Sequence, residues 1–148
     1  MRRAAIAALG LTLACAHAPP PARTLQVPGR ATPWALEITP LGTSPADLDE
    51  ALGRSIAANA SVVRVEGGAE PDGRLNVTVR TAGTPLADAT CTGDVRIVVR
   101  RAMGPAILDE ERHFDQPCGW DSNGRTILYD ACVAWALERS VDALSRPE

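Results

Sequence analysis

The chain has 148 residues and a formal net charge of -3, and it contains no lysine, so arginine supplies all of its permanent side-chain cations. This acidic balance argues against nucleic-acid binding, because a phosphate backbone needs a concentrated basic surface. Apolar residues make up 45% of the sequence and aromatic residues only 3%. The expected core therefore consists of Val, Leu, Ile and Ala side chains.

Residues 1–14 have the features of an export signal. Arg2 and Arg3 form a short basic start, and an apolar stretch follows from Ala4 to Leu13. About ten apolar residues match the core of a signal peptide, whereas a membrane-spanning helix needs roughly 20. The sequence therefore predicts a signal peptide over residues 1–14 and export from a bacterial cytoplasm.

The apolar stretch ends in the sequence LTLAC, residues 11–15. This segment resembles the lipobox of bacterial lipoproteins, in which small residues precede a cysteine that is acylated and becomes the new N-terminus. The resemblance implies lipid attachment at Cys15 and a cell-envelope location, on the outer membrane and facing the periplasm. Ala14 fits the pattern, and Thr12 and Leu13 depart from it. Cleavage after Ala16 or Ala18 is the alternative, and it would give a periplasmic or secreted protein.

A tether and a single domain follow the signal. Residues 15–33 are rich in Pro and Ala, and the run Pro19-Pro20-Pro21 favours a semi-rigid, extended spacer. Residues 34–148 are expected to form one domain. A spacer of this kind would hold an anchored domain clear of the lipid headgroups.

The hydrophobic periodicity of residues 34–148 predicts a strand, a helix, four strands and a helix. The first strand begins at Trp34 and stops before Pro40, and Ser44 and Pro45 have the residue types of a helix start. The remaining expected elements are a first helix to about 59, strands at 62–65, 75–79, 91–101 and 107–114, and a final helix from a cap at Asp121 or Ser122 to about 145. We expect an α+β fold with a mainly antiparallel sheet of four to five strands and two helices packed on one face.

Two buried faces are expected within these elements. In the fourth strand, Val95, Ile97 and Val99 alternate with polar residues and should point inward. In the final helix, the predicted apolar stripe consists of Ile127, Ala131, Ala134, Leu137, Val141 and Leu144.

Three cysteines remain in the domain once Cys15 is set apart, and an exported protein meets an oxidising compartment. If the strands at 91–101 and 107–114 form a hairpin around residues 103–106, Cys91 lies opposite Cys118, or opposite residue 116 if the loop is shifted. Cross-strand neighbours are close to bonding distance, so the predicted disulfide joins Cys91 and Cys118. Another pairing of the three cysteines, or three free thiols, are the alternatives. Cys132 is expected to be a small buried residue of the final helix.

Candidate chemistry is concentrated in the fifth strand. Asp109, Glu111 and His113 fall on one face of this strand, which makes them a possible metal site for a metal-dependent hydrolase. The alternative is a solvent-facing charged strand that resists aggregation. No zinc-type Cys/His spacing or phosphate-binding glycine loop is present in the sequence, so no cofactor is expected.

The leader and the layout of residues 34–145 resemble small envelope lipoproteins that assist lipid or lipopolysaccharide transport, including the LPS-assembly and transport-auxiliary classes. The resemblance implies a non-catalytic accessory or binding module. Its partners would be the membrane, through acylated Cys15, and an envelope protein or lipid. A secreted, soluble, disulfide-bearing binding domain and the metal-dependent hydrolase are the alternatives.

Overall fold

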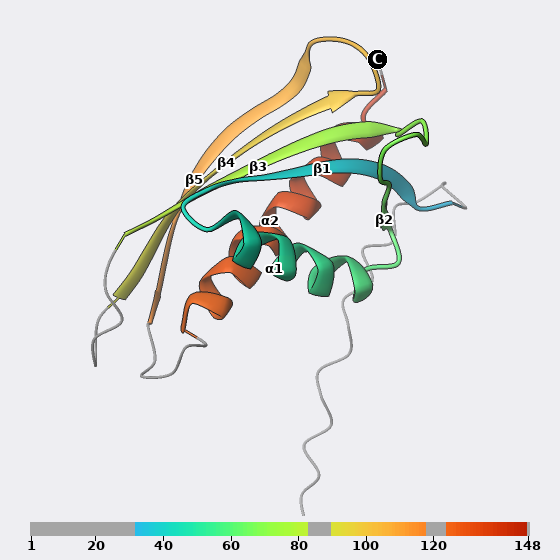
Figure 1. The fold of residues 1–148 in the computed structure, drawn as a ribbon. Coiled ribbons are helices and arrows are strands. Elements are labelled where there is room, and N and C mark those ends of the chain that lie inside the picture. The colour runs from blue at the N-terminus through green and yellow to red at the C-terminus, as the bar shows by residue number, and fades with distance from the viewer. Residues whose placement is uncertain (1–31, 83–89, 118–123, 148) are drawn as a thin grey trace, which may run out of the picture.

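The computed structural model describes residues 32–82, 90–117 and 124–147, and these form five strands and two helices. The elements in chain order are β1 (Trp34–Gly42), α1 (Pro45–Ala57), β2 (Val62–Arg64), β3 (Gly73–Ala82), β4 (Thr90–Arg101), β5 (Ala106–Pro117) and α2 (Gly124–Ser145). The predicted order of strand, helix, four strands and helix is confirmed (Figure 1).

All five strands form one sheet in the order β2-β1-β3-β4-β5. The β3–β4 and β4–β5 pairs are antiparallel, whereas β1 is parallel to both β2 and β3. The sheet is therefore mixed: its β3-β4-β5 part is antiparallel, in agreement with the predicted α+β fold, and its β1 side is parallel. The cause is the helix between β1 and β2, since a crossover through a helix lets the next strand run in the same direction.

β1 is longer than predicted, because it continues through Pro40 to Gly42. Proline has no backbone N–H to donate, so it fits in a strand only where no neighbouring strand needs that hydrogen bond. β2 accompanies β1 only from Trp34 to Leu36, while β3 pairs with it as far as Gly42. Pro40 therefore lies where β1 has a partner strand on one side only, which is the position that proline tolerates.

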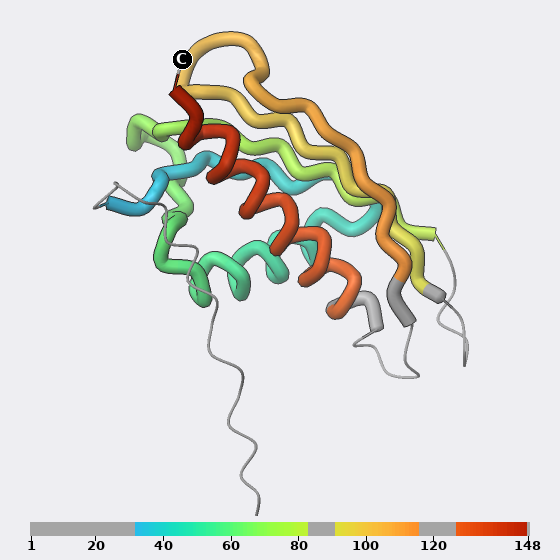
Figure 2. The backbone as a smooth tube through the Cα atoms, turned by 180° about the vertical axis from the view of Figure 1, so that it is seen from behind, coloured from blue at the N-terminus to red at the C-terminus, as the bar shows by residue number. Residues whose placement is uncertain are grey.

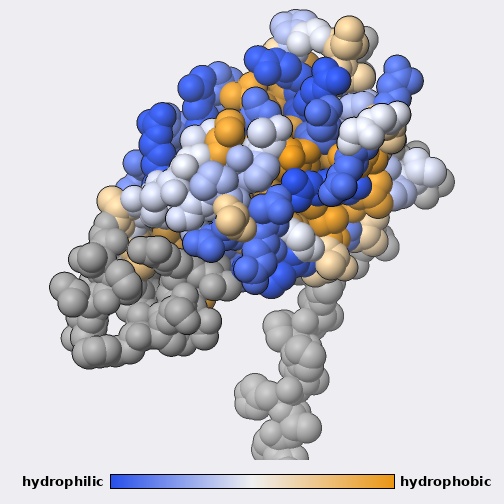
Figure 3. Space-filling view, in the orientation of Figure 1, coloured by the Kyte–Doolittle hydropathy of each residue, from blue (hydrophilic) through white to orange (hydrophobic). Residues whose placement is uncertain are grey.

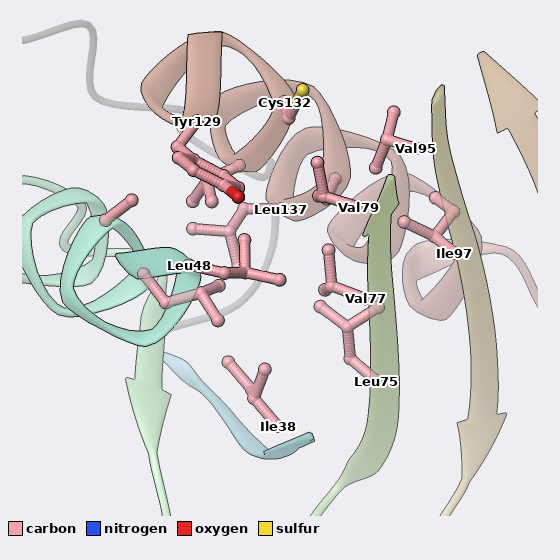
Figure 4. Close-up of a cluster of buried hydrophobic side chains, with 14 of the residues drawn as sticks. Ile38, Leu48, Leu75, Val77, Val79, Val95, Ile97, Tyr129, Cys132 and Leu137 are labelled. Carbon is pink, nitrogen blue, oxygen red and sulfur yellow. The ribbon is translucent and has the colours of Figure 1, made fainter. Parts of the chain in front are cut away.

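Both helices cover the same face of the sheet, as predicted (Figures 1 and 2). The core lies between them and the inward-facing residues of β1, β3 and β4 (Figure 4). Val95, Ile97 and Val99 are fully buried there, in agreement with the alternation in the sequence. The fold is thus two layers, with one apolar sheet face under two helices.

The start of α1 differs in detail from the expected cap. Ser44 occupies the N-cap position, and its side chain makes no capping hydrogen bond. Instead, the Leu48 N–H donates to the Ser44 carbonyl oxygen over 3.1 Å. Pro45 begins the helix as predicted, at a position where its missing N–H costs nothing.

The buried stripe of α2 is rotated from the predicted one. Ile127 is 53% exposed, and Ala134 is also exposed. The residues of α2 with buried side chains are Leu128, Tyr129, Cys132, Val133, Ala136, Leu137, Ser140, Val141, Ala143 and Leu144. This face is wider than the predicted stripe because α2 packs against both the sheet and α1.

Candidate functional site

The outward face of the sheet carries polar side chains from four strands. Its members on β3 and β4 alternate with the core residues, so the same period of two that builds the core also builds this surface. The residues of this outward face are Glu37 and Thr39 of β1; Arg74, Asn76, Thr78 and Arg80 of β3; Asp94, Arg96, Val98 and Arg100 of β4; and Asp109, Glu111, His113 and Asp115 of β5. We call this surface the polar face.

Asp109, Glu111 and His113 lie together on the polar face, as the sequence predicts, and each is exposed. They do not converge on one point. Arg96 of β4 donates from Nε and Nη2 to the two carboxylate oxygens of Asp109, over 2.9 and 2.8 Å. This bidentate pair holds the pKa of Asp109 below its ordinary value. Among the described residues, no group of three His, Cys, Asp or Glu side chains is placed to hold a metal ion, so the structure does not bring these three residues together as a metal site.

His113 is bound by two carboxylates. Its Nδ1 lies 2.6 Å from an oxygen of Asp94 across the strand pair, and its Nε2 lies 3.0 Å from an oxygen of Asp115. The hydrogen bond to Asp94 first, and then the one to Asp115, raise the pKa of His113 above 6.5. The imidazole is exposed to solvent and is hydrogen-bonded at both nitrogens. Its bond to Asp94 links β5 to β4.

The other face of β5 packs against α2. Arg139 donates from Nε and Nη2 to the two carboxylate oxygens of Glu110, over 2.9 and 2.5 Å, and this pairing lowers the pKa of Glu110. Farther along, the ring of Phe114 meets the ring of Trp135 edge-on at 6.0 Å. The guanidinium of Arg112 lies 4.9 Å from the Phe114 ring centroid. The charged strand is therefore fixed to α2 by its inward residues.

A second surface lies where β4 turns into β5, beside the C-terminal end of α2. A hollow of about 350 Å³ there is lined by Arg101, Met103, Pro105, Ile107, Ala143, Arg146 and Pro147. Met103 is 85% exposed. Arg101 donates from Nη2 to the Arg146 carbonyl oxygen over 2.8 Å. The sequence interpretation missed this surface, although the pair Arg100-Arg101 directly before a Gly-Pro turn could have indicated it.

The cysteines of the domain differ in burial, pairing and position. Cys91 is 4% exposed and points inward, as expected, but the residue opposite it on β5 is Gln116. This is the register of the shifted loop that the sequence left as the alternative, and the irregularity between Val99 and Arg100 changes the register by one position only. Cys118 lies outside the described residues, so the disulfide stays a prediction. Cys132 is a free, fully buried thiol, and burial raises its pKa to about 12, which confirms its expected structural role.

The predicted signal peptide, Cys15 and the predicted tether up to residue 31 lie outside the described residues, as do the cap candidates Asp121 and Ser122. Within the part of the chain that the structure does describe, neither helix has the length and apolar character needed to cross a bilayer.

Comparisons with known proteins define the fold alone. No family model and no curated protein matches the sequence. Among solved structures, the hypothetical protein CT253 from Chlamydia trachomatis is similar with a TM-score of 0.58 and 9% identity, over 76% of this chain and 98% of that one. PelC from Paraburkholderia phytofirmans has a TM-score of 0.47 and 12% identity, over 78% of this chain and 89% of that one. A minor lipoprotein from Acinetobacter baumannii has a TM-score of 0.38 and 12% identity, over 77% of this chain and 86% of that one. The chain thus shares the helix-on-sheet architecture of CT253.

Proposed function

We propose that this protein is a non-catalytic accessory or binding module of a bacterial cell envelope, anchored in a membrane through acylated Cys15. The observation that carries the proposal is the polar face, which both helices leave open to solvent across β1, β3, β4 and β5. Ion pairs on this face join neighbouring strands, as Arg96 joins Asp109 and Arg74 joins Glu37. Charges that are neutralised within the sheet suit a broad docking surface better than a reaction centre.

The partner in this proposal is an envelope protein that contacts the centre of the polar face. Asn76 and Thr78 lie in the middle strand of this face and are half-buried. Asn76 lies between Thr39 and Val98, and Thr78 lies between Leu41 and Arg96. A partner there would meet short polar and apolar side chains, with charged residues farther out on the face. This arrangement resembles the polar rim and less charged centre of many protein interfaces.

The anchor and the docking face are tested separately. We expect wild-type protein to incorporate labelled palmitate and to fractionate with membranes, and Cys15→Ala to lose both properties. Unlabelled, soluble behaviour of both proteins would refute the anchor and favour secretion.

For the docking face, a photocrosslinking residue at position 78 should give a discrete product in cells. The same residue at Asp47, exposed on α1 on the opposite side, is the matched control. Equal products from both positions, or none from position 78, would refute docking at this face.

A further inference from the structure

We propose that the end of the sheet around the β4–β5 turn docks on an anionic lipid surface. This basic corner consists of Arg74, Arg100, Arg101, Met103, Ile107 and Arg146. The inference rests on the proposed anchoring at Cys15 and deepens it, because it says which end of the domain meets the membrane.

The point where the tether joins the domain favours this end of the sheet as the one that meets the membrane. β1 starts at Trp34, directly after the tether, and Leu36 is in register with Gly73, which is in turn in register with Arg101. Only β3 separates β1 from β4, so the start of β1 and the end of β4 lie about 10 Å apart at neighbouring-strand spacings of nearly 5 Å. Figures 1 and 2 show the start of β1, the β4–β5 turn and the C-terminal end of α2 at the same end of the sheet. The tether therefore enters the domain at this end of the sheet, beside the basic corner.

The charge at this end is unusual for an acidic protein. Arg74 and Arg100 are directly opposed on β3 and β4, and both are exposed. Like charges that face each other across a strand pair are destabilising. Arg74 is partly compensated by Glu37, whose carboxylate oxygen lies 2.8 Å from its Nε, and it also donates to the Ala102 carbonyl oxygen. Arg101 and Arg146 bring the number of arginines around this turn to four, and Arg146 is ion-paired with Asp142 over 2.8 Å. The arginines still outnumber the carboxylates paired with them, so this surface attracts phosphate groups.

Apolar side chains project beside these arginines. Met103 is 85% exposed in the turn, and Ile107 is 39% exposed at the start of β5. In Figure 3 the turn forms the top of the molecule, with hydrophilic side chains directly beneath it. Cations next to exposed apolar side chains form the usual pattern of a surface that sits at the headgroup boundary, where arginines bind phosphates and apolar groups reach the acyl region. A lipid surface with anionic headgroups satisfies both features.

Binding to vesicles of defined composition tests this inference. The protein is the chain from residue 15 onward with Cys15→Ala, so that no acyl chain contributes. We expect it to sediment with vesicles of phosphatidylcholine and phosphatidylglycerol (70:30), to lose this binding at high salt, and to ignore pure phosphatidylcholine. Arg100→Ala should weaken the partition coefficient roughly fivefold, which is the usual contribution of one basic residue near an anionic membrane. Met103→Asp should also weaken it.

Arg80→Ala and Leu41→Asp are the matched controls. Arg80 is an exposed arginine on β3, six residues from Arg74 or about 20 Å along the strand, which exceeds the screening length at physiological salt. Leu41 is likewise exposed on β1, away from the turn. Binding without phosphatidylglycerol dependence, or equal losses in the control and corner variants, would overturn the inference. Palmitate labelling of the wild type reports the anchor independently, so a missing anchor and an inert corner give different results.

Discussion

Replacing Tyr129 with phenylalanine is expected to stabilise the protein. Tyr129 lies on α2, and its ring packs into the core near Leu48 and Leu137 (Figure 4). The residue is 2% exposed, and its hydroxyl oxygen is buried without a hydrogen-bond partner. A buried hydroxyl that gives up its water contacts and gains no partner costs about 1–3 kcal/mol. Phenylalanine keeps the ring and removes this cost.

The expected gain is smaller than the full cost, because removal of the oxygen leaves a small void. A cavity of that size costs a few tenths of a kcal/mol at roughly 24 cal/mol per Å³. We therefore expect Tyr129→Phe to raise the free energy of unfolding by about 1 kcal/mol, measured as a higher urea midpoint with an unchanged slope. Tyr129→Ala, which also removes the ring, should lower it by about 3–5 kcal/mol. A loss of 1 kcal/mol or more in Tyr129→Phe would refute the reasoning, because it would mean that the hydroxyl is hydrogen-bonded.

Three further predictions concern other positions. Gly42→Ala should destabilise the protein by at least about 1–2 kcal/mol. Gly42 has a φ of 114°, and an added Cβ would overlap the Val79 carbonyl oxygen. An unchanged melting temperature would contradict this prediction. His113 has a raised pKa, so its contribution to stability is fully present below about pH 6.5 and is lost as the pH rises through the folded-state pKa. The difference in urea midpoint between wild type and His113→Ala should therefore be largest near pH 5.5 and should shrink at alkaline pH. A difference that grows with pH would exclude the two ion pairs. A double-mutant cycle of Glu110→Gln and Arg139→Gln should give a coupling of about 1 kcal/mol, since this half-exposed bidentate pair joins β5 to α2; additive effects would show that it contributes nothing.

The order of the elements was predictable because local patterns dictate it. Alternation marks β3 and β4, and helical spacing after Pro45 marks α1, without reference to any partner strand. The direction of β1 was not predictable in this way, because a strand has the same period of two in parallel and antiparallel sheets. The rotation of the α2 stripe has a similar origin. Ile127 fits a helical period, but only the position of α1 decides which side of α2 is buried.

The candidate site was predictable in part. The alternation correctly placed Asp109, Glu111 and His113 on one face, and it could not show that Arg96 and Asp94 lie directly beside them. Cross-strand neighbours depend on the exact register, and the irregularity at Val99 changes that register. The pairing of Cys91 with Gln116 is the shifted-loop alternative, which the sequence could not choose over position 118.

The position of β1 inside the sheet has a mechanical consequence. A force transmitted through the residues before Trp34 acts along the axis of a strand that pairs with β2 on one side and with β3 on the other. Backbone hydrogen bonds run across the strands, so such a pull loads many of them together in shear. An edge strand pulled from its end at right angles would instead lose them one at a time. A domain built in this way can stay folded while its tether is under tension, even with β2 only three residues long.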